Sequence, residues 1–402
     1  MIDLIQYEIA VQSMGLSMCV FMALFFFMDS KDKTSTKKSP RRFLSGFMLT
    51  YGTTFLDDLL IATEITSRYP SLHGVFIPAF FLLGPFLYFY VRDTCAMHSY
   101  TFARPLLKHF ILFATSIIVL IPFYILPSDD KQVIFSENNI SSTESLLPWF
   151  AIISISMVHV ALLIQMLFYL VQSFRILMRY FENLKDFFSN VEDRRLDWLR
   201  LLIFMLSISW AVFTYESVVV WPDLMDDTAR VATSTLDVAI IYFISFMGLR
   251  QVAVFRDQIS SQKHQNKAKT DSNGKQKYAR SALSEEDSER ILSKLYHAIA
   301  NEGLYSDSML SLRGLSDHTN ISSNYISQVI NQKTDSHFFD YVNRFRIEAA
   351  MKKLTHDGEK NSILNIAYDV GFNSKSTFNT AFKRHTGKTP SEFRKMQIPV
   401  AD

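Results

Sequence analysis

The chain has 402 residues, of which 49% are hydrophobic, 14% aromatic and only 20% charged. Up to Arg250 it holds 19 basic against 22 acidic residues, a net charge of −3, and the remaining 22 and 17 give +5. This division, the Phe- and Leu-rich first part and a total of two cysteines exclude a single water-soluble globule, a disordered chain and a disulfide or cysteine-zinc scaffold.

Seven apolar runs fill the first part of the chain. Each has about 20 residues, which is enough to cross ~30 Å of hydrocarbon as a helix. A set of buried core helices in a large soluble protein is the alternative, and seven consecutive runs of spanning length disfavour it. The predicted transmembrane helices are residues 4–28, 43–62, 72–91, 106–126, 146–171, 198–221 and 231–249.

The charges of the connecting segments predict the orientation, because positive residues near span ends stay in the cytoplasm. The first, third and fifth connections hold most of the Lys and Arg residues, whereas the alternate connections are mainly acidic. We therefore expect a multi-pass protein of the bacterial cytoplasmic membrane with its amino terminus outside and its carboxyl-terminal part in the cytoplasm. The first run starts with Met1-Ile2-Asp3 and lacks the positive region of a cleaved signal peptide.

Ionisable side chains inside the predicted spans are costly in lipid and are functional candidates. Four carboxylates fall at a similar depth near the outer boundary, and a histidine lies nearer the middle of the fifth span. They predict an outward-facing pocket for a small cation or amine ligand, and the alternative is that they face interfacial water or neighbouring helices. The residues are Asp57, Asp58, His159, Glu216 and Asp237.

A polar, basic segment separates the two parts. Residues 251–283 are rich in Gln, Ser, Lys and Asn, which predicts a flexible tether. The expected domains are therefore a seven-span membrane domain (1–250), this linker (251–283) and a cytoplasmic domain (284–402). Apolar residues of the last part recur at helical spacing, and together with the spans they predict an all-α protein.

The cytoplasmic part contains one helical motif twice. In the later copy Ile366, Ala367 and Val370 form a stripe, Gly371 breaks it, and a second helix follows. In the earlier copy Asn320 stands at the turn, where a left-handed conformation is tolerated. Two short helices joined by such a turn form a helix-turn-helix unit.

Each second helix then exposes short polar side chains, which can read base edges in a major groove. Basic residues around them suit phosphate oxygens. An ordinary solvated helix face is the alternative reading for each residue singly. The candidates for the DNA backbone are Lys333, Arg346, Lys375, Lys383 and Arg384.

Residues from about 307 to 396 resemble the DNA-binding domain of AraC/XylS-family transcription regulators. Family-like residues are Ala349, Ile366, Ala367, Gly371, Phe372, Phe378, Phe382, Gly387, Pro390 and Phe393. The resemblance implies two recognition helices in successive major grooves of double-stranded DNA, with RNA polymerase as a partner. It places base reading on Asn324, Ser327, Gln328, Ser376, Thr377 and Thr380. Ser316 stands where the family usually has Ala, and residues 333–337 lack a glycine often found there.

We expect a membrane-bound transcription regulator that couples a signal sensed in its transmembrane domain to gene expression. The sequence carries no short enzyme motif and no metal-spaced histidine pair, so neither catalysis nor a cofactor or metal is expected. The alternative is a transporter- or receptor-like protein whose helical tail is a regulatory module. Because the predicted linker is flexible, we expect signalling through pairing of two membrane domains into a homodimer. Pairing would raise the local concentration of two cytoplasmic DNA-binding domains at one DNA site.

Overall fold

The computed structural model describes residues 4–30, 40–95, 106–128, 130–131, 146–191, 196–218, 227–266, 284–356 and 361–397. These residues are helical apart from turns and short connections, and within them a single antiparallel β-bridge, between Phe188 and Ser311, is the only extended pairing. The all-α prediction is confirmed. The chain divides into two compact units, residues 1–178 with 197–271, and residues 179–196 with 272–402.

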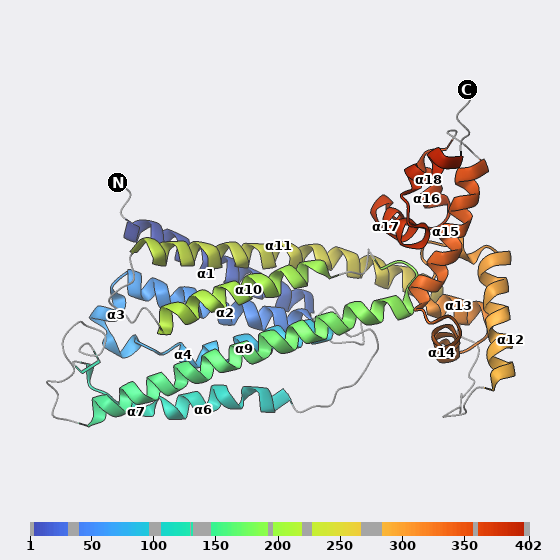
Figure 1. Ribbon diagram of the computed structural model, residues 1–402. Coiled ribbons are helices and arrows are strands. Elements are labelled where there is room, and N and C mark those ends of the chain that lie inside the picture. The colour runs from blue at the N-terminus through green and yellow to red at the C-terminus, as the bar shows by residue number, and fades with distance from the viewer. Residues whose placement is uncertain are drawn as a thin grey trace. The chain divides into compact units, whose positions relative to one another are not determined.

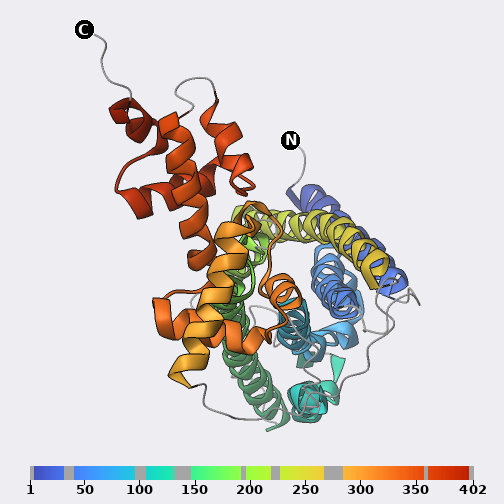
Figure 2. The same ribbon diagram turned by 90° about the vertical axis from the view of Figure 1, so that its right-hand side faces the viewer.

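Long apolar helices dominate the first unit and run side by side (Figure 1). α1 (Leu4–Ser30) packs against α2 (Arg41–Ala62) and α11 (Asp227–Asn266), and α10 (Asp197–Val218) also packs against α11. The 41-residue α9 (Leu147–Phe187) is the longest described helix. Figure 2 shows the same helices nearly end-on.

Five segments are long and apolar enough to cross a membrane, compared with the seven that we predicted. They are Leu4–Asp29, Pro70–Thr94, Leu147–Phe187, Asp197–Tyr215 and Val231–Arg250. The second predicted span lies within α2, a helix that carries two Arg and two Asp residues, and the fourth contains only a shorter apolar helix, Leu107–Val119. Large apolar side chains remain exposed on several of these helices, for example Met28 at 73% and Ile164 at 65%, as expected of surfaces that face lipid.

The third and fourth predicted spans are not continuous helices. The third consists of a 3₁₀ turn (Pro70–Leu72), α4 (Ile77–Phe80) and α5 (Leu83–Thr94). The fourth consists of η2 (Leu106–Phe110), α6 (Ile111–Val119) and α7 (Ile121–Tyr124). Pro78 and Pro122 stand within the first turns of α4 and α7, where the lack of an N–H is tolerated but a preceding helix cannot continue unbroken.

The predicted linker also differs from expectation. Helix α11 continues to Asn266 and so includes the first half of the segment that we expected to be flexible. Its remaining residues, 267–283, lie outside the described part of the chain.

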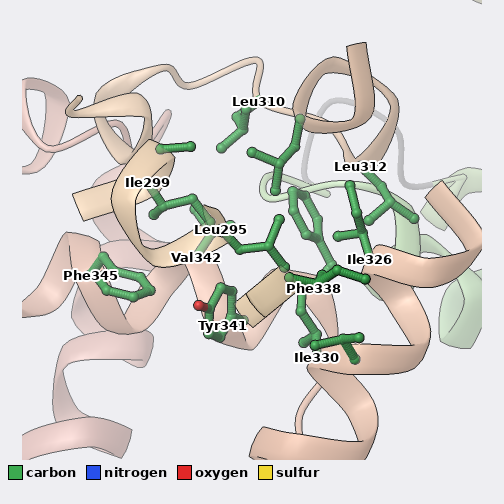
Figure 3. Packing of buried hydrophobic residues seen from close by; sticks show 14 residues of the cluster. Leu295, Ile299, Leu310, Leu312, Ile326, Ile330, Phe338, Tyr341, Val342 and Phe345 are labelled. Carbon is green, nitrogen blue, oxygen red and sulfur yellow. The ribbon is translucent and has the colours of Figure 1, made fainter. Parts of the chain in front are cut away.

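The second unit has two hydrophobic clusters that share one helix, α15 (Phe338–His356). Its first half supplies Phe338, Tyr341, Val342 and Phe345 to the cluster shown in Figure 3. Its second half supplies Ile347, Ala350 and Leu354 to the other cluster. Because each cluster holds one helix pair, α15 connects the two pairs through continuous helical backbone.

Residues 179–191, which follow most of α9 in the chain, belong to this second unit rather than to the first. Phe187, at the end of α9, packs against the first cluster. Helix α12 (Glu285–Tyr296) begins at Ser284, whose side chain caps it by accepting a hydrogen bond from the Asp287 N–H.

Candidate nucleic-acid interface

The first helix pair is α13 (Leu312–Thr319) and α14 (Ser323–Thr334). Asn320 ends α13 in the left-handed conformation, with a φ of 56°, as predicted. The Ser316 hydroxyl donates a 2.6 Å hydrogen bond to the Ile321 carbonyl across the turn. The serine that replaces the family's usual alanine therefore has a partner in the close contact between the helices.

Asp335 occupies the position after α14 where the family often has glycine. It adopts the left-handed conformation with a φ of 46°, and its backbone N–H caps the end of the helix by donating to the Asn331 carbonyl. Aspartate tolerates this conformation better than most residues do, because its short polar side chain can hydrogen-bond locally. The missing glycine therefore does not prevent the normal ending of the helix.

The second pair is α16 (Ile363–Asp369) and α17 (Lys375–Thr386). Ala367 is fully buried between them. Gly371 has a φ of 95°, and a Cβ atom there would lie 2.6 Å from the Tyr305 carbonyl oxygen and 2.9 Å from that of Ser306. Both the backbone conformation and the lack of space require glycine at this turn.

The predicted base-reading side chains lie on α14 and α17, opposite the buried faces of those helices. Asn324, Ser376 and Thr380 are exposed, whereas Ser327, Gln328 and Thr377 are partly exposed. The buried faces are formed by Ile326, Val329, Ile330, Phe378 and Phe382. Thr377 also takes part in the N-cap of its helix, because its backbone N–H donates to the hydroxyl of the capping residue Ser374. The structure thus presents one polar face on each second helix.

Basic residues border these faces. Lys375, Lys383 and Arg384 are exposed, and Lys333 is partly exposed. Two of them are paired: Lys333 with Glu285 of α12, and Arg384 with Asp340 of α15. Both cations are therefore already paired with a carboxylate in this structure.

A family profile described as a helix-turn-helix domain matches residues 315–396. The transcriptional regulatory protein YesN of Bacillus subtilis is 35% identical over 109 residues, which are 27% of this chain and 29% of that protein. The melibiose operon regulatory protein of Escherichia coli is 29% identical over 90 residues, 22% of this chain and 29% of that protein. The chain thus spans less than a third of the length of these curated relatives.

Residues 315–396 form an AraC-type helix-turn-helix domain. Two solved structures are also similar in sequence. A protein of unknown function from Listeria innocua is 30% identical, with a TM-score of 0.24, over 27% of this chain and 98% of that one. The carboxyl-terminal domain of AraT, a response regulator from Geobacillus stearothermophilus, is 28% identical, with a TM-score of 0.25, over 30% and 94%.

Arg346 of the AraC-type domain does not fit its predicted role at the DNA backbone. Its side chain is fully buried, and its guanidinium donates to the carbonyl oxygens of Tyr305 (2.8 Å), Asp307 (2.9 Å) and Ser189 (3.0 Å). Burial lowers the pKa of Arg346 to about 10, so the group is still cationic at neutral pH. Because a phosphate cannot reach it, the prediction for this residue is wrong.

The predicted membrane pocket is brought together only in part. Gln12 of α1 donates to Asp58 (3.2 Å) and to Ser234 of α11 (2.8 Å), and Ser209 of α10 donates to Asp237 of α11 (2.8 Å). Asp58 and Asp237 therefore belong to polar contacts that join four helices.

The other predicted pocket residues are placed differently. Asp57 neighbours Asp58 on α2 and is partly exposed, whereas the His159 ring stacks on Phe213, with 6.1 Å between centroids. The side chain of Glu216 lies outside the described part of the chain. The pocket stays a prediction, carried by Asp58 and Asp237.

Sequence reasoning missed two features of the AraC-type domain. Serines cap four of its helices, at positions 311, 322, 362 and 374, each accepting a hydrogen bond from the N–H three residues later. A serine before each apolar stripe was the available signal. The second is the contact of Ser189 with Arg346, for which their separation of 157 residues offered no signal.

Proposed function

We propose that the protein is a membrane-bound, sequence-specific DNA-binding transcription regulator. The observation that carries this proposal is the pair of polar faces on α14 and α17, joined by α15 within one AraC-type domain. Two recognition helices of this kind read adjacent major grooves, which are ~34 Å apart along one face of the duplex. The amide and hydroxyl groups of Gln328 and Thr380 are suited to base edges.

Selection of DNA ligands from a random duplex library, with the full chain in nanodiscs, tests this function. We expect an enriched site with two conserved segments about one helical turn apart. Failure to enrich any sequence over a non-specific duplex would contradict the proposal.

The membrane part is proposed to span the bacterial cytoplasmic membrane, with the amino terminus outside and the AraC-type domain in the cytoplasm. The apolar helices and the basic first, third and fifth connections support this orientation. Reporter fusions at Asp402 test it. A reporter that is active only on the outer side would place the domain away from the chromosome and exclude the function.

The signal, the pairing and the transcriptional partner are further parts of the proposal. The carboxylates Asp58 and Asp237 support a small cation or amine as the ligand of the membrane part. Homodimerisation would place two AraC-type domains at one operator, and RNA polymerase is the expected partner there. Operator affinity measured with and without a panel of amines, in monomeric and forced-dimer nanodiscs, tests the ligand and the dimer together.

A transporter- or receptor-like function with a regulatory tail is the second candidate. The observation in its favour is that the third and fourth predicted spans are broken into short helices, as in transporters that bind substrate at helix breaks. Uptake of labelled amines into proteoliposomes separates the two functions. Transport that persists after residues 284–402 are deleted would favour this second candidate.

A further inference from the structure

A short segment at the end of α9 and just beyond it is built into the unit that holds the AraC-type domain. Phe188 forms an antiparallel β-bridge with Ser311, the residue that caps α13. The Ser189 N–H and hydroxyl both donate to the Leu310 carbonyl, at 3.2 and 2.6 Å. Asp186, at the end of α9, also pairs with His337 at 2.7 Å. We call residues 186–189 the docked segment.

The docked segment meets Arg346, the buried cation of α15. Arg346 donates to the Ser189 carbonyl (3.0 Å) and to its hydroxyl (2.9 Å). Ser189 is 1% exposed, so water cannot replace these bonds without opening the domain. Leaving a buried guanidinium without a hydrogen-bond partner costs free energy, so substitutions at Ser189 should destabilise the domain.

The same arginine also touches the turn of the second helix pair. Its guanidinium carbon lies 5.6 Å from the centre of the Phe372 ring, and its Nε lies 3.0 Å from where a Cβ of Gly371 would be. Its Nε also donates to the Tyr305 carbonyl, which closes over Gly371. Arg346 therefore contacts the docked segment on one side and the second turn on the other.

We propose that Ser189 and Arg346 are positioning residues that fix the second helix-turn-helix unit relative to the first. Ser189 lies two residues beyond the end of α9, a helix long enough to span the membrane, so a displacement of α9 would reach the second turn through one side chain. The proposal rests on the proposed DNA binding. It differs from the expected tethering mechanism, since it needs no change in the pairing of two chains.

The chemistry of the contact indicates what its loss would do. Without the Ser189 hydroxyl, Arg346 Nη2 keeps only the Asp307 carbonyl, and the Leu310 carbonyl keeps only the Ser189 N–H. Each helix pair retains its own apolar cluster. We therefore expect each pair to stay folded and bind its own half-site normally. Simultaneous binding of two half-sites should weaken, because it depends on how closely their spacing is matched.

The test uses the full chain in phosphatidylethanolamine–phosphatidylglycerol nanodiscs and a duplex selected on the unmodified protein. Ser189→Ala is compared with Ser293→Ala, the same change at an exposed position of α12. We expect Ser189→Ala to bind the two-half-site duplex about tenfold more weakly, as for a lost hydrogen bond to a charged group. Its affinity for duplexes with either half-site scrambled should equal that of the unmodified protein, and Ser293→Ala should change neither.

Hydrogen exchange in the absence of DNA supplies a readout that does not depend on the proposed function. We expect Ser189→Ala to speed exchange at residues 371–374 while the amides of α14 and α17 keep their protection. Unchanged exchange at 371–374, or an equal loss of affinity for all three duplexes, would overturn the positioning role. If the unmodified protein selects no duplex, the proposed function fails, and exchange at 371–374 alone decides whether Ser189 acts on the second turn.

Discussion

The Ser316 hydroxyl and the Ile321 carbonyl are joined by a 2.6 Å hydrogen bond across the turn of the first helix pair. This bond stabilises the turn through a side chain, whereas Asn320 allows the turn through its left-handed backbone conformation. A hydroxyl in place of the family's methyl group is therefore part of the turn in this chain.

Ser316→Ala tests this contact. The substitution removes the donor but leaves a side chain that fits between the helices, so we expect a loss of about 1 kcal/mol in the opening free energy of the first pair. Hydrogen exchange of the α14 amides in the full chain measures it, with the α17 amides as an internal control. A gain in stability would mean that packing of the alanine methyl group contributes more than the hydrogen bond of the serine hydroxyl.

Gly371→Ala should be among the most damaging single changes in the AraC-type domain. The new Cβ would lie 2.6 Å from the Tyr305 carbonyl oxygen, in a backbone conformation that already costs about 1–2 kcal/mol for alanine. With the overlap included, we expect a loss of about 3 kcal/mol or more, seen as faster exchange of the α17 amides.

Gly387→Ala is the matched control. Gly387 also has a positive φ, of 75°, but a Cβ there would meet no atom within 4 Å. We expect a loss of only about 1 kcal/mol. Similar losses at the two glycines would show that the carbonyls of Tyr305 and Ser306 move aside.

Base and phosphate contacts should respond differently to mutation. Thr380→Ala, on the exposed face of α17, should change the preferred base at one position and cost about 1–3 kcal/mol on the selected site. Lys375→Gln should weaken all duplexes alike and lower the salt slope by about 1. Selection and salt titration with each variant measure both effects. Loss of base preference in the lysine variant would reverse the assignments.

The stability of the last described helix, α18 (Pro390–Gln397), should depend on pH. The Thr389 N–H donates to the Glu392 carboxylate at 2.8 Å, and this bond holds the pKa of Glu392 below its ordinary value of 4.5. Since the folded pKa is the lower one, the bond stabilises the helix above about pH 4.5, and the stabilisation is lost as the pH falls through the folded pKa.

Glu392→Gln should flatten this acid dependence in the exchange of the α18 amides. The same change at Glu289, an exposed glutamate of α12, serves as the control. If Glu392→Gln left the pH dependence of α18 exchange unchanged, another titrating group would be responsible for the acid sensitivity of this helix.

Local patterns predicted the AraC-type domain well. The stripes of α16 and α17, the turn at Asn320 and the break at Gly371 follow from neighbours in sequence, and the structure confirms them. The burial of Arg346 could not be predicted in this way. A charged residue on an amphipathic helix is usually exposed, and its partners at Ser189, Tyr305 and Asp307 come from segments that only the tertiary fold brings together.

The apolar first unit was predictable in composition but less so in geometry. Apolar length identified α1, α9, α10 and α11, yet it could not show that the third and fourth runs break near prolines. The position of a residue along a predicted span gave the depth of Asp58 and His159, but the direction in which each side chain points depends on the rotation of its helix. That rotation is set by contacts such as Tyr169 against Gly84, where a Cβ would lie only 2.5 Å from the ring.

Asp340→Asn should strengthen DNA binding. Asp340 of α15 pairs with Arg384 of α17, so a phosphate that binds Arg384 competes with this carboxylate. Removing the carboxylate's charge frees Arg384, and we expect a few-fold higher affinity, because exposed ion pairs are worth about 0.2–1 kcal/mol. The salt slope should steepen by up to about one phosphate contact.

A double-mutant cycle isolates this effect. In an Arg384→Gln background the Asp340→Asn change should have almost no effect on affinity, because the cation that it frees is absent. Binding of a duplex at several salt concentrations measures all four proteins of the cycle. Weaker binding by Asp340→Asn alone would mean that the ion pair orders Arg384 for the phosphate rather than competing with it, since the carboxylate then holds the guanidinium in its binding position.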